Sequence, residues 1–334
     1  MQRLISRRTI YRVGVIAALG LCSLAAFALS MRLGSLDLPL SRIWCAMLDA
    51  EAGVHHRILW SIRLPRTLVA ALVGVCLSLS GCLLQAVMRN PLAAPHLIGV
   101  SSGAGLAGIV ILILFPSAYF LLTPVAFAGA LLSTLLVYAL AWEHGLKPVR
   151  MILAGVAVSS FLGAWIMALM IFFPDRVHSV LGFMVGGLAA CSWRHVRMLL
   201  PYAAVGSALV FFMARRLNLL MLGDDTARSL GIAVERTRLV FIALAALLAA
   251  SAVSVVGLLG FVGLVVPHMT RLIIGSDHRF LLPACALMGA GLLMACDTLS
   301  RVVLDPVEVP VGIVMAMLGA PFFLYLLRMN FSKQ

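Results

Sequence analysis

The sequence has few charged residues: Asp, Glu, Lys and Arg make up 11% of its 334 positions, whereas 63% of the positions are hydrophobic. Soluble domains of average composition carry about 25% charged residues, so this chain has too few to cover a water-exposed surface. A surface that faces lipid needs no such cover. The composition therefore argues against an ordinary soluble protein and favours a membrane protein, in which helices satisfy the backbone hydrogen bonds.

Acidic residues are scarcer than basic ones, with 12 Asp and Glu against 25 Lys and Arg. A net charge of +13 could indicate a nucleic-acid partner, but the basic residues lie in short clusters between long apolar runs. Basic residues beside membrane spans set the topology and meet anionic lipid headgroups. We therefore expect a lipid bilayer as the partner of these charges, and no nucleic acid.

Two kinds of motif are missing. The sequence contains no GxxxxGK[ST] phosphate-binding loop, so any ATP that drives this protein must be hydrolysed by another chain. Its seven cysteines show no CxxC spacing, which argues against a zinc site or a redox pair. We expect no catalytic centre, no metal centre and no cofactor.

Uncharged runs long enough to cross a membrane recur along the chain, since a spanning helix needs about 20 apolar residues. Two runs are too long for one span, and Pro116 and the glycines near 257–263 mark where each reverses. The segment 177–193 is expected to be a short extracytoplasmic or re-entrant helix. This count gives an all-α membrane protein of about ten spans, with a single domain over 1–334; the spans fall at 13–31, 67–88, two within 91–142, 151–174, 198–214, two within 239–274, 280–296 and 309–327.

An even number of spans places both termini on one side. With the termini inside, the inner segments hold 16 of the 25 Lys and Arg residues and the outer segments hold nine. The positive-inside rule therefore predicts that both termini are cytoplasmic.

The spans hold almost no ionisable residues, each of which would cost about 2.5–3.5 kcal/mol at the bilayer centre. This scarcity argues against an ion-coupled secondary transporter, which remains a remote alternative, and against an enzyme with its site at membrane depth. Asp297 lies at the end of the ninth span, and Arg301 follows four residues later on the same helical face. The two can pair at the outer interface.

Two inner segments stand out. The charged loop near 218–236 contains a short helix pattern, in which Asp or Thr can cap the start and Gly231 can end it. It fits a binding segment for a cytoplasmic partner, or a solvated connection. After the second span, Pro91 disfavours helix at Asn90 and breaks the chain at the membrane edge.

Seven stretches follow one another in order along about four fifths of the chain. They are Arg63-Leu64-Pro65-Arg66, Gly81 with Gln85, Asn90-Pro91-Leu92-Ala93 with 97–104, Ala227-Arg228-Ser229-Leu230-Gly231, Gly260 to His268 with Arg271, Asp297 with Arg301, and Val309 to Gly312 with Gly319 to Phe323. As a set they resemble the permease family of ABC importers for iron–siderophore complexes, haem and cobalamin. The only departures are Ala94 and His96, where the family segment often has other residues.

The resemblance implies a dimeric permease of a type II ABC importer, with two cytoplasmic ATPase subunits and an extracytoplasmic substrate-binding protein. A homodimer is the default expectation. The resemblance also assigns roles by position: binding-protein docking to Arg63, Arg66 and Arg301, a cytoplasmic gate to Asn90 and Leu92, and ATPase coupling to Gly223, Asp224, Ala227, Arg228, Ser229, Leu230 and Gly231.

The function expected from the resemblance is transport, not catalysis. The permease would carry a bulky iron chelate, a ferric siderophore, across the bacterial cytoplasmic membrane by alternating access. ATP hydrolysis on the separate ATPase subunits would drive it. Haem and cobalamin remain open as alternative substrates, because permeases for all three share these motifs.

Overall fold

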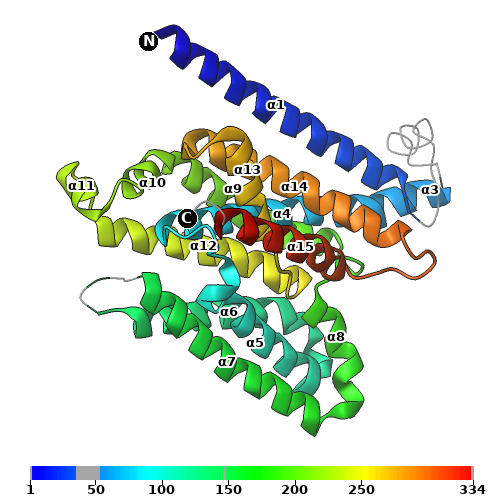
Figure 1. Ribbon diagram of the computed structural model, residues 1–334. Coiled ribbons are helices and arrows are strands. Elements are labelled where there is room, and N and C mark those ends of the chain that lie inside the picture. Colours follow the sequence, from blue (N-terminus) through cyan, green and yellow to red (C-terminus); the bar gives the residue numbers. More distant parts are fainter. Residues whose placement is uncertain (1, 35–52, 144, 146–147, 332–334) are drawn as a thin grey trace.

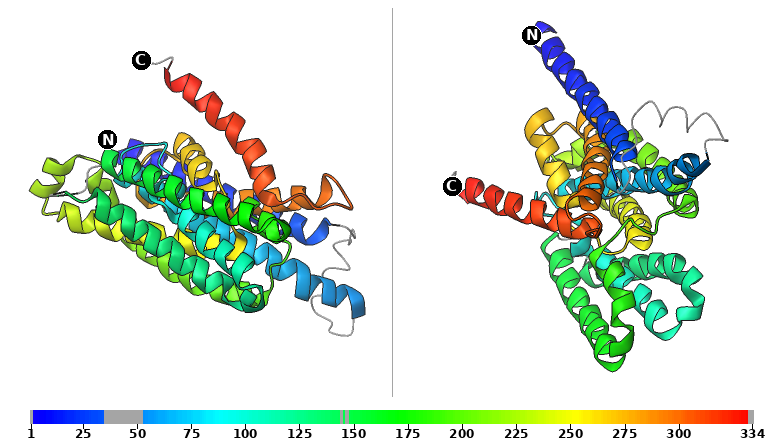
Figure 2. Two further views of the ribbon diagram at one scale, coloured as in Figure 1. Left: turned by 90° about the horizontal axis from the view of Figure 1, so that it is seen from below. Right: turned by 90° about the vertical axis from the view of Figure 1, so that its right-hand side faces the viewer.

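The computed structural model describes residues 2–34, 53–143, 145 and 148–331, and it contains helices and no strand within those ranges. Most of the long helices run in roughly one direction between two ends of the molecule (Figure 1). The termini lie toward the end that carries α10 and α11, away from the end that carries α3. The part of α15 next to the C-terminus projects away from the bundle in both views of Figure 2.

Within the described residues, seven helices are long and apolar enough to cross a membrane, and three further helices contribute shorter apolar stretches. Together they correspond one to one with the predicted spans, so the prediction of about ten spans is confirmed. The seven are α1 (Gln2–Arg32), α4 (Leu64–Val87), α6 (Leu122–Ala141), α7 (Pro148–Phe172), α9 (Trp193–Phe212), α12 (Val234–Val256) and α14 (His278–Val302); the other three are α5 (Val100–Leu114), α13 (Val262–Ile274) and α15 (Val311–Phe331), whose apolar stretch is Val311–Leu324.

Short helices connect the spans. α3 (Gly53–Ile58) and a π-helical turn, η1 (Leu59–Arg63), continue directly into α4. The predicted short helix after the fifth span is α8 (Val177–Val185), which ends where Gly186 leaves the helical conformation. η2 (Pro95–Ile98) precedes α5, η3 (Pro116–Leu121) separates α5 from α6, and η4 (Pro174–Arg176) leads into α8; α10 (Ala214–Leu220) and α11 (Asp224–Ser229) join α9 to α12.

The centre of the bundle is formed by α4 and α12, of which 78% and 72% of the most apolar stretch is buried. The Ser80 hydroxyl on α4 donates to the Ala245 carbonyl on α12 at 2.7 Å. Gly81 allows α4 to cross α13 closely, because a Cβ there would overlap the Gly263 carbonyl oxygen. By contrast, α1 and α7 lie at the periphery, with 11% and 17% of the corresponding stretch buried.

Candidate functional site

The predicted coupling segment contains a six-residue helix, α11, that lies outside the long helices at one end of the molecule (Figure 1). Asp224 and Asp225 occupy its first turn and Arg228 its last, as the helix dipole favours. Gly223 and Gly231 flank the helix with positive φ angles of 111° and 81°. The predicted helix and its end at Gly231 are therefore present, but the predicted cap by an Asp or Thr side chain is wrong, because Gly223 occupies the N-cap position.

One side of α11 is anchored and the other is open. Ala227 is fully buried, whereas Arg228, Ser229, Leu230 and Gly231 are exposed. Arg228 contacts Asp225 at 3.5 Å and Glu235 at 3.9 Å, but its side chain remains 57% exposed. The open side thus presents a charged and apolar surface that a partner could contact.

Asp224 ties this helix to two of the long helices. Its Oδ1 atom accepts from Arg238 on α12 at 2.7 Å and from Arg89, just beyond α4, at 2.5 Å. Partial burial raises the pKa of Asp224, but the neighbouring Arg238 and Arg89 guanidinium groups outweigh that effect and hold it below its ordinary value. Arg89 also donates to the Leu220 carbonyl at 2.8 Å, so the helix is held at several points.

The predicted gate residues lie in the same turn as Arg89. Asn90 accepts a hydrogen bond at its Oδ1 atom from the Leu92 backbone N–H at 2.9 Å, and its own N–H donates to the Gln85 carbonyl at 3.1 Å. Arg89 has a φ angle of 47°. The structure therefore joins the predicted coupling and gate segments through Arg89, a residue that the sequence did not single out.

The predicted docking arginines are buried: Arg63, Arg66 and Arg301 are 5%, 6% and 6% exposed. Arg63 donates to the carbonyls of Met31 and Arg32, the last residues of α1, at 2.8 and 2.9 Å. Burial and internal partners give these three residues a structural role at this end of the bundle. Their docking role stays a prediction.

The buried carboxylate in this cluster is Asp297, whose side chain is 0% exposed. It pairs with Arg66 at 2.9 Å and with Arg301 at 3.3 Å. The pairing of Asp297 with Arg301 was predicted, but the pairing with Arg66 was not. A second carboxylate, Glu308, pairs with Arg66 at 2.8 Å and is 46% exposed. We refer to Arg63, Arg66, Arg301, Asp297 and Glu308 as the arginine cluster.

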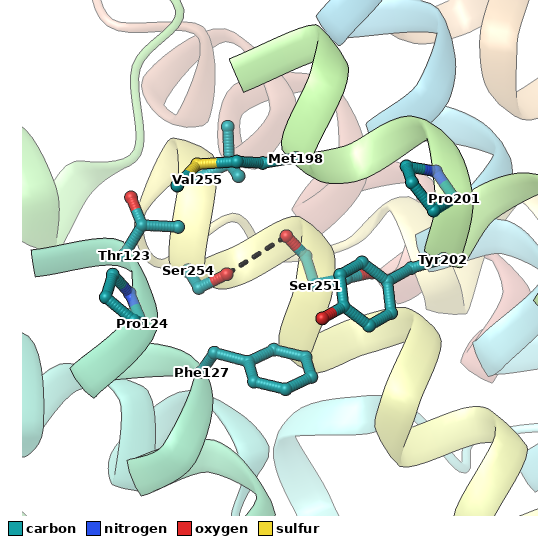
Figure 3. A pocket seen from close by; sticks show the side chains of 9 residues that line it. All are labelled: Thr123, Pro124, Phe127, Met198, Pro201, Tyr202, Ser251, Ser254 and Val255. Carbon is teal, nitrogen blue, oxygen red and sulfur yellow. Dashed lines mark hydrogen bonds between the residues drawn. The ribbon is translucent and has the colours of Figure 1, made fainter. Parts of the chain in front are cut away.

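Two of the cavities among the described spans differ in the polar groups that line them. One, of about 370 Å³, lies between α6, α9 and α12 (Figure 3). Its lining is apolar apart from hydroxyl groups and contains no charged side chain, so nothing in it selects a charged ligand. It is lined by Thr123, Pro124, Phe127, Met198, Pro201, Tyr202, Ser251, Ser254 and Val255.

The other cavity is an open groove of about 580 Å³ along α7. At one end of the groove, Gly155 lets α7 approach η2 closely, since a Cβ at this position would overlap the Leu97 carbonyl oxygen. The groove is lined by small and hydroxyl-bearing residues of α7, including Ser159 and Ser160, and by His96 of η2.

A family model described as the FecCD transport family matches residues 21–329. The chain belongs to the FecCD transport family. The cobalamin import system permease protein BtuC of Halobacterium salinarum is 44% identical over 273 residues, which cover 81% of this chain and 73% of the relative. The iron(3+)-hydroxamate import system permease protein FhuB of Bacillus subtilis is 40% identical over 318 residues, covering 94% and 82%.

Another relative, the Fe(3+) dicitrate transport system permease protein FecD of Escherichia coli, is 39% identical over 302 residues, covering 90% and 93%. A solved structure described as the inward-facing conformation of a metal-chelate type ABC transporter matches with a TM-score of 0.86 and 29% identity. The match covers 95% of this chain and 99% of that one. Membership and fold agree that this is a multi-pass ABC transporter permease.

Proposed function

We propose that this permease imports a bulky iron chelate, of the ferric siderophore class, across the bacterial cytoplasmic membrane by alternating access driven by ATP. Relatives named for ferric hydroxamate and ferric dicitrate support an iron chelate. The relative named for cobalamin supports the alternative substrate, and haem is the other alternative. Both termini would face the cytoplasm, on the side of α11.

The observation that carries the proposal is the connection from α11 to the gate. The open side of α11 presents Arg228 and Leu230, while Asp224 on the same helix binds Arg89 at 2.5 Å. ATPase subunits that push or release α11 would therefore move the turn that contains Asn90. Two such subunits would supply the hydrolysis, so the permease itself would transmit movement and would not be an enzyme.

Two further partners complete the proposed assembly. A second copy of the chain would cover helices with large exposed surfaces, such as α7, and would enclose the pathway. A substrate-binding protein would dock at the arginine cluster through its own carboxylates, in charge-assisted pairs with Arg66 and its neighbours.

The test is uptake into proteoliposomes that contain the permease, its ATPase and its binding protein. Ferric hydroxamate, ferric dicitrate, haem and cobalamin would be offered in parallel, with and without ATP. Accumulation of an iron chelate only with ATP supports the proposal; accumulation of cobalamin or haem alone moves the protein to the alternative. Uptake that follows an ion gradient without ATP would refute the transport mechanism.

The coupling path has its own test. Arg89→Met removes the ion pair with Asp224, so ATP hydrolysis should continue while uptake falls. Arg215→Met, at an exposed arginine on α10, is the matched control and should leave both rates unchanged. If Arg89→Met keeps the normal ratio of uptake to hydrolysis, movement does not pass through this pair.

A further inference from the structure

Glu308 occupies the exposed side of the arginine cluster. It lies in the loop 303–310 between α14 and α15, two residues before Pro310 and three before the first residue of α15. Its Oε2 atom pairs with Nη1 of Arg66 at 2.8 Å, while its own side chain is 46% exposed. The buried Arg66 side chain is therefore separated from solvent on this side by Glu308, a carboxylate of the same chain.

The two carboxylates of the cluster differ in how replaceable they are. Asp297 is 0% exposed and bridges Arg66 and Arg301, so no outside group can reach its place. The Glu308 side chain is about half exposed to solvent. Ion pairs at exposed sites contribute little net free energy, because solvent competes for both charges. With three arginines and two carboxylates the cluster carries a net charge of +1, and it would carry +2 without Glu308.

We propose that Glu308 is an exchangeable partner of Arg66, which a carboxylate of the docking protein displaces. This inference rests on the proposed function, because it takes the arginine cluster as the docking surface. It explains how a buried arginine can serve there: the guanidinium stays in place on Asp297, and only its outward Nη1 atom changes partner. The positive charge that attracts an acidic protein is fully developed only when Glu308 leaves.

The exchange also links docking to α15. The Val309 N–H donates to the Ser300 carbonyl at 3.0 Å, and the Gly312 N–H in the first turn of α15 donates to the Gly186 carbonyl at 3.1 Å. Release of Glu308 removes the ion pair that holds the loop 303–310 on α4 and leaves these backbone contacts. Docking would thus loosen the segment that leads into a span.

The first experiment compares binding-protein affinity for the wild-type permease, Glu308→Gln and Asp305→Asn, each reconstituted in nanodiscs with the ATPase. Asp305→Asn is the matched control, because Asp305 is exposed on the same loop and the change in net charge is the same. Glu308→Gln should tighten docking by up to about fivefold, the factor that corresponds to an exposed ion pair. Asp305→Asn should change it much less. Equal effects of the two variants, or weaker docking by Glu308→Gln, would overturn the exchange.

The second experiment needs no binding protein. Hydrogen exchange of the backbone amides in 303–312 should be faster in Glu308→Gln than in wild type and in Asp305→Asn. Unchanged exchange in Glu308→Gln would mean that Glu308 does not hold the loop, which overturns the inference by itself. If the loop responds as expected but the binding protein does not dock to the wild-type permease, the docking part of the proposed function is wrong and the displacing group is not on that protein.

Discussion

Asp297→Asn tests how the arginine cluster is held together. The substitution keeps the size of the side chain but removes the charge that Arg66 and Arg301 share at 2.9 and 3.3 Å. Charges about 4 Å apart attract by about 4 kcal/mol at an effective dielectric constant of 20. The loss also leaves two buried guanidinium groups that repel each other. Removing one partner of a buried ion pair typically costs 3–5 kcal/mol, and we expect a destabilisation of about that size.

The assay is unfolding of the purified permease in mixed micelles with increasing SDS, followed by tryptophan fluorescence. Trp60 of η1 and Trp193, the first residue of α9, contact each other edge to face with ring centroids 5.7 Å apart. Asp225→Asn, at a fully exposed carboxylate, is the control and should unfold like wild type. A second variant that combines Asp297→Asn with Arg66→Met should recover part of the stability, because it also removes one unpaired cation. Unfolding of Asp297→Asn within about 1 kcal/mol of wild type would refute the reasoning.

Three further predictions concern other parts of the chain. Gly81→Ala should lower the yield of folded protein in size-exclusion chromatography, because its Cβ overlaps the Gly263 carbonyl, whereas Gly14→Ala, with open space around it, should not. Asp224→Asn should speed proteolysis of the coupling loop at pH 7. Because the folded-state pKa of Asp224 is depressed, the stabilising effect of its carboxylate is complete above about pH 4 and is lost as the pH falls through the folded pKa. The proteolysis rates of wild type and Asp224→Asn should therefore converge in acid. His96→Ala should raise the KM for a carboxylate-bearing ferric chelate more than for one without carboxylates in the uptake assay, because the imidazole N–H of His96 can donate a hydrogen bond to a carboxylate in the groove along α7; equal shifts would contradict this role.

The arrangement of the spans could be predicted because each span carries its own signal. The long apolar run 239–270 was divided at its glycines, and the structure divides it at the same place, between Val256 and Val262. α11 was predictable for the same reason: its acidic first turn and the glycines on either side of it are local features. Both features depend on residues that are neighbours in the chain, so the sequence was sufficient to predict them.

Ion-pair partners were less accessible, because they depend on packing between distant segments. Asp297 and Arg301 are four residues apart on one helix, and their pairing was predicted from that spacing. Arg66 and Asp297 are 231 positions apart, and Arg89 and Asp224 are 135 apart, with no local pattern to join them. Both ion pairs depend on how the helices pack against each other, so the sequence alone could not predict them.

The position of the arginines shows why an end of a span is a poor guide to exposure. Arg63, Arg66 and Arg301 all lie near span ends, where side chains usually reach water, and the family resemblance assigns them to docking with a partner. In the structure, the last residues of α1 supply carbonyl acceptors to Arg63, and α14 supplies Asp297 as the partner of Arg66. A guanidinium group with five donors can be enclosed when its neighbours accept hydrogen bonds from it. For Arg66, access to a partner depends on Glu308, which is the exposed one of its two carboxylate partners. Substitution of Glu308, and not of the arginines, therefore separates the structural role of this cluster from a role in docking.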